Sequence, residues 1–575
     1  MAVMTGGESV VLALKENGVD TVFGIIGVQM NPIYDALYNE PGIKHITVRH
    51  EQCAAYMADA YARVTGRLGV TLTIGGPGVC NALTGIGRAY AGSSPVLLIS
   101  SGMDFGETWQ GRGVIHEMDN QLGVVAPLVK WGRRVELLEE IPSAIHEAVA
   151  YALSGRTRPV YLEIPAGVLS SKAEIEITKG SNRPKPKGDA EKVLRLATAL
   201  LRARKPLVWA GGGVARSGAT DELVALAEFL QTPVMTTVSG KGAIPDDHYL
   251  CQGASHDFYG PELEIAQEAD LVLAVGTRLM AATKGPLGLI PVQNLFQIDI
   301  DESQIGKSCP VKLGIVGDAK EVLSQLLVHL RTTGQPRPSR KQELESIKTE
   351  RREALRERGS VKVSALEEVR SLLDRDAVVF ADLTMLGTWA DTAFEVYQAR
   401  TYHSCTYFGT IGFALPSAIG AKVAQPERQV VALTGDGGFL ANCQELATAI
   451  QYGVKIVVII ANDDCYGAPK EFQRRKGGGR FIGVDLVNPD FVKLAEAFGV
   501  RGVRINGLSD LGTALKDALN ADKATVIEVP VHGISQYAPA WDSPDVTVPG
   551  EPLPAQPGDM TTETIGLGGM MGGRT

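Results

Sequence analysis

A glycine-rich turn in the last third of the chain limits the possible fold more than any other feature of the sequence. The run VVALT at 430–434 reads as a buried strand, and the apolar run at 455–460 reads as the next one. Between them, Gly435, Gly437 and Gly438 leave backbone N–H groups open at the start of a helix. Such a turn can receive a phosphate, because no Cβ atom blocks it and the helix presents its positive end. The pattern predicts parallel strands covered on both faces, with an anion site at their edge.

Two carboxylates accompany this turn. Asp436 lies within it, and Asp463 follows the next strand. Because the carboxyl ends of neighbouring parallel strands meet at one edge of a sheet, the two side chains can share an ion. Carboxylate oxygens suit Mg²⁺. A Gly-Asp-Gly turn alone often binds nothing, so the pairing of Asp436 with Asp463 carries this prediction.

Size and composition restrict the class of protein. A chain of 575 residues divides into about three or four domains. The net charge of −9 argues against binding of nucleic acid or membrane surfaces, which need a strong basic field. The 7 cysteines show no CxxC pair, as expected for reduced thiols. No signal peptide or long apolar run is evident, and we expect a soluble cytoplasmic protein.

Helix and strand patterns alternate along most of the chain, as in α/β domains with helices on both faces of a parallel sheet. We expect three doubly wound α/β domains and a Gly/Pro-rich C-terminal tail, at residues 1–178, 190–332, 361–532 and 533–575. The segment 335–359 is charged throughout and predicts a solvated connecting helix, to which we assign no function.

The first and third domains read as distant copies. The segments 69–101 and 429–461 both run strand, glycine turn, helix and strand at nearly equal spacing. Chance matches between two α/β units are common, so this likeness is only suggestive by itself.

The motifs of both copies resemble those of thiamine diphosphate enzymes. In that family, Gly-Asp-Gly is followed after the next strand by Asn-Asn. Alignment on Gly467 puts Asp463 at the second Asn, with Asn462 as the alternative ligand and the carbonyl of Cys465 as the third. The resemblance implies a pyrimidine-binding domain, a central domain and a diphosphate-binding domain. It also implies a cofactor held between two chains, and therefore a homodimer at minimum, with a homotetramer as the fuller expectation.

Glu51 is the first catalytic candidate. It lies in RHEQCAAYMADAYAR, which matches the family pattern around a Glu that protonates the aminopyrimidine ring. The alternative is an ordinary glutamate favoured by a helix N-terminus.

The resemblance also implies the cofactor contacts. Ile411 corresponds to the large apolar residue that lies under the bent cofactor, between two glycines that allow close approach. The full set of cofactor candidates is Ile26, Gly27, Gly76, Asn81, Met385, Leu386, Gly409, Ile411, Gly435, Gly437, Gly438, Tyr466 and Gly467.

Other segments point to the substrate. The run GIIGVQM resembles oxalyl-CoA decarboxylases and 2-hydroxyacyl-CoA lyases more than acetolactate synthases. His116 and Glu117 stand where the synthases have Gln-Glu, and His116 is either a proton donor or a packed polar residue. Glu496 is a candidate base for a hydroxyl proton, and an ordinary helix glutamate is the alternative.

The central domain would bind FAD in the synthases and the ADP part of coenzyme A in the acyl-CoA relatives. The synthases' Asp-Arg-Val-Thr-Gly run is missing after Arg278, which makes FAD less favoured. Our candidates for CoA contacts are Arg156, Gly212, Lys241, Arg278, Lys284, Asp299 and Ile300.

Together these resemblances favour a Mg²⁺- and thiamine diphosphate-dependent lyase. It would cleave a 2-hydroxyacyl-CoA reversibly to formyl-CoA and a ketone or aldehyde. The closest resemblance is to actinobacterial enzymes acting on 2-hydroxyisobutyryl-CoA. The alternatives are an acetolactate-synthase-like decarboxylase or carboligase, an oxalyl-CoA decarboxylase, or a catalytically silent nucleotide-binding regulator. The tail at 533–575 would close over the substrate, since its apolar residues can dock and exclude water.

Overall fold

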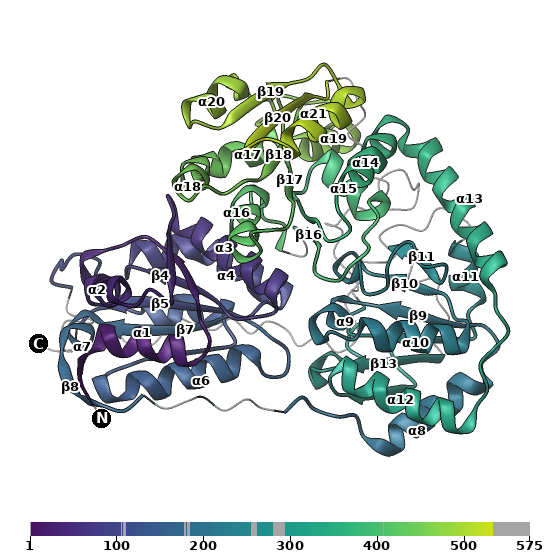
Figure 1. The fold of residues 1–575 in the computed structure, drawn as a ribbon, viewed down its shortest axis with the longest axis horizontal. Coiled ribbons are helices and arrows are strands. Elements are labelled where there is room, and N and C mark those ends of the chain that lie inside the picture. Colours follow the sequence, from purple (N-terminus) through teal and green to yellow (C-terminus); the bar gives the residue numbers. More distant parts are fainter. Residues whose placement is uncertain are drawn as a thin grey trace, which may run out of the picture.

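The computed structural model describes residues 2–104, 106, 111–177, 180, 184–254, 262–279, 294–405 and 408–532. Three lobes are visible in Figure 1, with the first and last joined at the centre of the molecule. The predicted lid at 533–575 and the CoA candidate Lys284 lie outside the described residues. Within these ranges, no helix is long and apolar enough to cross a membrane. All 7 cysteines are free.

The N-terminal lobe is a six-stranded parallel sheet with helices on both faces. Its strands in spatial order are β3 (Lys44–Thr47), β2 (Thr21–Gly24), β4 (Gly69–Thr73), β5 (Val96–Gly102), β7 (Val160–Pro165) and β6 (Trp131–Arg134). Its helices are α1 (Gly6–Glu16), α2 (Asn31–Asn39), α3 (Glu51–Thr65), α4 (Pro77–Gly92), α5 (Gln121–Val125), α6 (Ile141–Leu153) and α7 (Ala166–Ser170). A separate antiparallel pair joins β1 (Ala2–Thr5) to β8 (Lys172–Ile175).

The C-terminal lobe repeats this topology. Its strands in spatial order are β16 (Tyr402–Ser404), β15 (Val378–Ala381), β17 (Val430–Gly435), β18 (Val457–Asn462), β20 (Thr525–Pro530) and β19 (Arg501–Arg504). Counted along the chain, both sheets have the order 2-1-3-4-6-5. The helices are α14 (Val361–Leu372), α15 (Met385–Ala393), α16 (Ala414–Ala424), α17 (Asp436–Asn442), α18 (Leu446–Gln451), α19 (Gly467–Lys476), α20 (Phe491–Ala497) and α21 (Leu511–Leu519). The sequence likeness between the two segments therefore reflects two copies of one fold.

The central lobe has a different order, 3-2-1-4-5-6. Its parallel strands run β11 (Cys251–Ala254), β10 (Val234–Thr236), β9 (Pro206–Ala210), β12 (Leu271–Val275), β13 (Leu295–Asp299) and β14 (Leu313–Val316). Its helices are α8 (Ala190–Arg202), α9 (Gly212–Ser217), α10 (Thr220–Leu230), α11 (Glu262–Glu268) and α12 (Ala319–Thr333). Three doubly wound parallel sheets confirm the predicted fold class. The charged helix expected from the sequence is α13 (Lys341–Gly359), which runs along the edge of the molecule to the C-terminal lobe (Figure 1).

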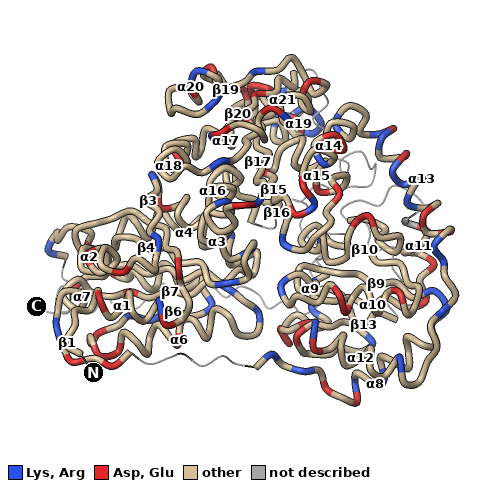
Figure 2. The backbone as a smooth tube through the Cα atoms, in the orientation of Figure 1, with Lys and Arg blue, Asp and Glu red and all other residues tan. Residues whose placement is uncertain are grey.

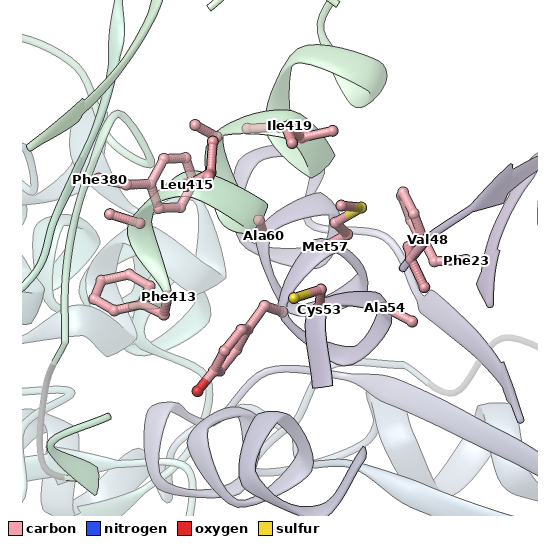
Figure 3. Close-up of a cluster of buried hydrophobic side chains, with 14 of the residues drawn as sticks. Phe23, Val48, Cys53, Ala54, Met57, Ala60, Phe380, Phe413, Leu415 and Ile419 are labelled. Carbon is pink, nitrogen blue, oxygen red and sulfur yellow. The ribbon is translucent and has the colours of Figure 1, made fainter. Parts of the chain in front are cut away.

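One hydrophobic core joins the two copies through α3 and α16. Figure 3 shows Cys53 and Met57 of α3 beside Leu415 and Ile419 of α16, and all four side chains are buried. A Cβ atom at Gly420 would lie 2.5 Å from the carbonyl oxygen of Met57, so only glycine lets the two helix backbones approach this closely. The lobes therefore form a single packed unit at this contact.

Candidate active site

The predicted metal and diphosphate residues gather at the carboxyl ends of β17 and β18. Asp436 is the first residue of α17, and its side chain is buried. Asn488 donates from Nδ2 to Asp436 Oδ2 at 2.7 Å, to Asp464 Oδ1 at 2.8 Å and to Asn462 Oδ1 at 3.1 Å. Three oxygens, from the ends of β17 and β18 and the turn after β18, thus converge on one amide nitrogen. The sequence interpretation missed Asn488, although the run Asn488-Pro489-Asp490 before α20 marks a helix start.

The neighbouring carboxylates decide how well a cation suits this site. Burial raises the pKa of Asp436 and of Asp463, and the charges of Asp463 and Asp464 raise the pKa of Asp436 further. Cys465 donates its S–H to Asp463 Oδ2 at 3.1 Å. Clustered acids of this kind are relieved by a hard cation, so these residues fit Mg²⁺.

Asn462, the alternative ligand, points elsewhere with its amide nitrogen, which donates to Glu528 Oε1 of β20 at 2.9 Å. No group of three His, Cys, Asp or Glu side chains in the described ranges forms a metal cluster. A magnesium ion here would therefore depend on two carboxylates together with neutral oxygens. The choice between Asp463 and Asn462 stays a prediction.

The glycine turn forms the floor of the same site. A Cβ atom at Gly437 would lie 2.6 Å from the ring of Tyr466, so the tyrosine closes over a space that only glycine leaves open. Gly435 caps the start of α17, and Gly467 begins α19 beside Tyr466. The N–H groups of this turn and the adjacent acids fit a diphosphate carried with its metal ion.

Ile411 lies beside this turn. It is 48% exposed, and Gly412, with φ +75°, lies so close to Gly438 that a Cβ atom would be 2.5 Å from the Gly438 carbonyl oxygen. Gly409, with φ +65°, faces open space. An exposed isoleucine between two left-handed glycines is available to pack against a bound ring.

A buried acid that the sequence interpretation missed holds this segment in place. Asp382 Oδ1 accepts from the N–H groups of Phe413 and Ala414, and its Oδ2 accepts from Thr434 Oγ1 at 2.7 Å. Burial raises the pKa of Asp382 to about 6. The acid connects the end of β15 to the start of α16 and to β17.

Met385 and Leu386 follow on α15. Both side chains are buried in the C-terminal core, so only their backbone is free to contact a cofactor.

The second half of the predicted site lies in the N-terminal copy. Glu51 begins α3, and Asn81 of α4 donates to Glu51 Oε2 at 3.0 Å. Gly76 caps α4 with φ +64°, and its N–H donates to Gln121 Oε1 at 2.6 Å. Ile26, 52% exposed, and Gly27 follow β2 at the same edge of the sheet. The candidates expected to contact the pyrimidine ring therefore share one edge.

His116 and Glu117 differ in their surroundings. His116 has φ +66°, and among the described residues its buried Nδ1 has no hydrogen-bond partner. Its backbone lies against Gly76, since a Cβ atom there would be 3.0 Å from the His116 carbonyl oxygen. The carboxylate of Glu117 accepts from the N–H groups of residues 112–114, the shortest bond being 2.7 Å from Gly113. Glu117 thus shapes its own loop, whereas His116 keeps a ring nitrogen for another group.

Glu496 stands apart from these residues. It is exposed on α20, where Phe491 and Ala495 form the buried face. The structure gives it no interaction with either half of the site, and its role as a base stays a prediction.

A cavity of about 410 Å³ lies at the switch point of the central lobe, between the ends of β9 and β12, and residues 91–93 and 153–157 of the N-terminal lobe form its other side. In doubly wound sheets this is where ligands bind. Five of the predicted CoA residues line it: Arg156, Gly212, Arg278, Asp299 and Ile300. Arg216, which the sequence interpretation missed, adds a third guanidinium. The cavity suits a nucleotide phosphate.

Lys241 lies outside this cavity. It is buried, 3.8 Å from Asp246 Oδ2, and its ammonium lies over the ring of Tyr402.

Comparison with known proteins agrees with the three-lobed arrangement. Residues 4–124 match the N-terminal TPP binding domain of thiamine pyrophosphate enzymes, residues 193–326 match their central domain, and residues 382–529 match their C-terminal TPP binding domain.

Full-length relatives are similar as well. The chain is 34% identical over 547 residues to a probable acetolactate synthase large subunit of Methanocaldococcus jannaschii, with 92% of both chains covered. It is 36% identical over 537 residues to the probable 2-ketoarginine decarboxylase AruI of Pseudomonas aeruginosa, covering 92% of this chain and 94% of the other. It is 34% identical over 561 residues to the acetolactate synthase isozyme 3 large subunit of Escherichia coli, covering 94% of this chain and 97% of the other. The chain therefore belongs to the thiamine pyrophosphate enzyme family.

Proposed function

We propose that this enzyme decarboxylates a 2-oxo acid and can join the remaining fragment to a second carbonyl compound, as acetolactate synthases do. The observation that carries the proposal is the reciprocal placement of acids: Glu51 with Asn81 in one copy of the fold, and Asp436 with Asp463 in the other. The similar proteins, named acetolactate synthases and a 2-ketoarginine decarboxylase, support this chemistry over the lyase expected from the sequence.

Each residue then has a defined task. Bound thiamine diphosphate supplies an electron sink for the carbon next to the substrate carbonyl. Asp436, Asp463 and the carbonyl of Cys465 would hold Mg²⁺, while the N–H groups of the glycine turn receive the diphosphate. Glu51 would hold a proton against the pyrimidine ring, with Asn81 fixing its carboxylate. Ile411 would support the bent cofactor and help exclude water.

We also propose that a second copy of the chain completes the site. α3 and α16 pack against each other inside one chain, which uses that face of both helices. Large apolar side chains remain exposed around both halves: Ile26, Val28, Ile115, Leu383, Ile411, Phe481 and Ile482. A homodimer that pairs one N-terminal half with the partner's C-terminal half would cover them, and a homotetramer would pair two such dimers.

Mixing two inactive variants tests this arrangement. Glu51→Gln and Asp436→Asn chains, unfolded together and refolded, would form mixed dimers with one intact site if the halves come from different chains. About a quarter of the wild-type activity should return, because half of the randomly formed dimers are mixed and each carries one of two sites. No recovery, with normal dimers seen by analytical ultracentrifugation, would place both halves in one chain.

The 2-hydroxyacyl-CoA lyase is the second candidate. The central cavity favours it, because Arg156, Arg216 and Arg278 suit the phosphates of coenzyme A, although they suit those of FAD equally. We would load the protein with thiamine diphosphate and Mg²⁺ and supply pyruvate, 2-hydroxyisobutyryl-CoA, lactyl-CoA or oxalyl-CoA. Release of CO₂ from pyruvate supports the first proposal. Formyl-CoA formed from a hydroxyacyl-CoA, without turnover of pyruvate, supports the second. A yellow purified protein would indicate a bound flavin, and release of FAD on denaturation would identify it.

A further inference from the structure

A second cavity, of about 230 Å³, lies where α13 meets both the central and the C-terminal lobes. We call it the linker cavity. One wall comes from β11 and its neighbours, one from α13 and one from α14 with the segment after α15. Six of its lining residues are basic: Lys241, Lys348, Arg351, Arg352, Arg356 and Arg370. Figure 2 shows the alternating charges of α13 along the edge of the molecule.

Among the residues that the structure describes, three acids line the same cavity, and each already has a basic partner. Glu367 pairs with Arg356 at 3.0 Å. Glu395 pairs with Arg352. The third, Asp246, has Lys241 at 3.8 Å. Counted over the described lining residues, six basic and three acidic side chains surround one small space.

Arg370 is a buried member of this basic group. It is 6% exposed, and it donates to the carbonyl oxygens of Leu373 and Asp374 without a carboxylate partner among the ion pairs of the described residues. Its buried Nε has no hydrogen-bond acceptor within the part of the chain that the structure describes. Burial lowers the pKa of this guanidinium, although the rings of Phe394 and Tyr397 and the charge of Glu395 compensate the cation in part. Burying such a group is unfavourable unless an anion accompanies it.

Two further buried polar side chains in the cavity wall have unsatisfied atoms. Thr392 Oγ1, which can donate to an anion, and Gln252 Oε1, which can only accept, have no partner among the described residues, and both side chains are at least 97% buried. Gly253 has φ +94°, and a Cβ atom there would collide with the guanidinium of Arg351. Glycine therefore lets that guanidinium approach the strand, where Arg351 also donates to the Thr392 carbonyl at 3.3 Å.

From these observations we propose that the linker cavity binds a small multivalent oxyanion, with a phosphate group as the chemistry that fits best. Guanidinium groups donate in a planar fork that matches phosphate oxygens, and several converge here. The volume is below the roughly 300–1,000 Å³ of pockets for drug-sized ligands, so the ligand is a small phosphorylated compound or phosphate itself. This site is separate from the nucleotide cavity, and the proposal does not depend on the proposed activity.

A bound anion would tie three parts of the molecule together. α13, α14 and β11 each contribute charged or polar groups, so ligand binding favours the arrangement in which all three are packed. The expected sign is a phosphate-dependent gain in thermal stability.

The test uses the full chain loaded with thiamine diphosphate and Mg²⁺, so that its own diphosphate site is filled. Inorganic phosphate is titrated at constant ionic strength against chloride, with calorimetry for binding and scanning fluorimetry for unfolding. We expect saturable binding and a rise in Tm of about 2 °C or more at saturation. Arg351→Gln should weaken phosphate binding at least about tenfold and remove most of that rise.

Two controls locate the site. Arg358→Gln removes a charge from the same helix but outside the cavity lining, and Arg216→Gln removes one from the nucleotide cavity. Both should keep the phosphate response. If Arg351→Gln fails to fold, Lys348→Gln serves in its place, with the same expected loss. The proposal is overturned if the wild type shows no saturable phosphate binding, or if the cavity variants bind as the wild type does. Loss of the response in Arg216→Gln alone would move the anion to the nucleotide cavity and overturn it equally.

Discussion

The N-terminal and C-terminal lobes have the same strand order but carry acids at opposite positions. In the first copy, the helix after the second strand begins with Glu51, and the helix after the third strand begins with Pro77. In the second copy, the corresponding residues are Ala414 and Asp436. A glycine precedes the helix in both copies at the third strand.

The comparison shows how one fold can carry two different sets of predicted site residues. The copies share the glycine turn, which suits an anion, but the second adds there Asp436, the acid of the predicted metal site. In the first copy the acid is instead Glu51, at the start of α3, and α3 packs against α16 of the C-terminal lobe. Neither copy holds all the predicted site residues, so the proposed site needs residues from both.

The largest expected effect comes from Glu51→Gln. If Glu51 moves or holds a proton, kcat should fall by about 10²–10⁴-fold, while Mg²⁺ affinity stays unchanged because the metal end lies in the other copy. Steady-state kinetics and calorimetry measure the two quantities. Glu8→Gln, in the first turn of α1, is the control for a glutamate that only stabilises a helix start. If Glu51→Gln lowered Mg²⁺ affinity as much as it lowered kcat, the two copies would not have separate roles.

Asp436→Asn should give the complementary pattern. We expect Mg²⁺ affinity to drop by more than about 100-fold, since a group that only supports a metal ligand already costs about 10–100-fold. The matched change is Pro77→Asp, which puts an acid at the equivalent position without Asp463 or Asn488 nearby. It should create no Mg²⁺ site. Tight Mg²⁺ binding gained by Pro77→Asp would show that the turn alone defines the site.

Asn488→Ala tests the residue that converges on three oxygens. This change removes the hydrogen bonds that Asn488 donates to Asp436, Asn462 and Asp464. We therefore expect Mg²⁺ to bind roughly 10–100-fold more weakly. Electron paramagnetic resonance with Mn²⁺ as the probe measures this without turnover. Asn520→Ala, which removes an exposed asparagine at the end of α21, should have no effect. Unchanged Mn²⁺ binding in Asn488→Ala would reduce its role to loop packing.

The sequence allowed prediction of features that depend on local patterns. Buried strands, the glycine turn and the start of α3 depend on short sequence runs, so the three α/β sheets could be predicted. Glu51 and Asn81 were each named as candidates, but their hydrogen bond was not predicted. Asn488 and Asp382 were not predicted, because their partners come from three different elements and only the folded chain brings these together. The charged helix α13 was predicted, but its contact with a cavity was not. Charge alone does not distinguish a helix face that is exposed to solvent from one that lines a cavity.

Gly420→Ala tests whether the copies depend on each other for stability. The added methyl group would lie 2.5 Å from the Met57 carbonyl oxygen and force α16 away from α3. Overpacking of this kind costs about 1–3 kcal/mol, which exceeds the gain in helix propensity of about 1 kcal/mol. Thermal unfolding should show a lower Tm. Gly507→Ala, where a Cβ atom meets nothing within 4 Å, is the control. A Tm equal to that of the wild type would mean that the lobes adjust freely at this contact.

The last comparison concerns Asp382, whose position after the first strand is occupied by Ile25 in the other copy. Its pKa is raised from 3.8 to about 6, so the folded chain holds this proton more tightly than the unfolded chain does. The free energy of unfolding therefore falls as pH rises from 3.8 to about 6, and above this range the stability contributed by the bound proton is fully lost. Asp382→Asn cannot ionise and should lack this part of the pH dependence. Relative to the wild type, it should gain stability as pH rises from 3.8 to about 6, as about 1.4 kcal/mol corresponds to each pKa unit. Urea unfolding across this range, with the exposed Asp517→Asn as the control, measures the difference. Parallel pH profiles for Asp382→Asn and the wild type would mean that the carboxylate stays ionised in the fold, and that its three hydrogen bonds outweigh its burial.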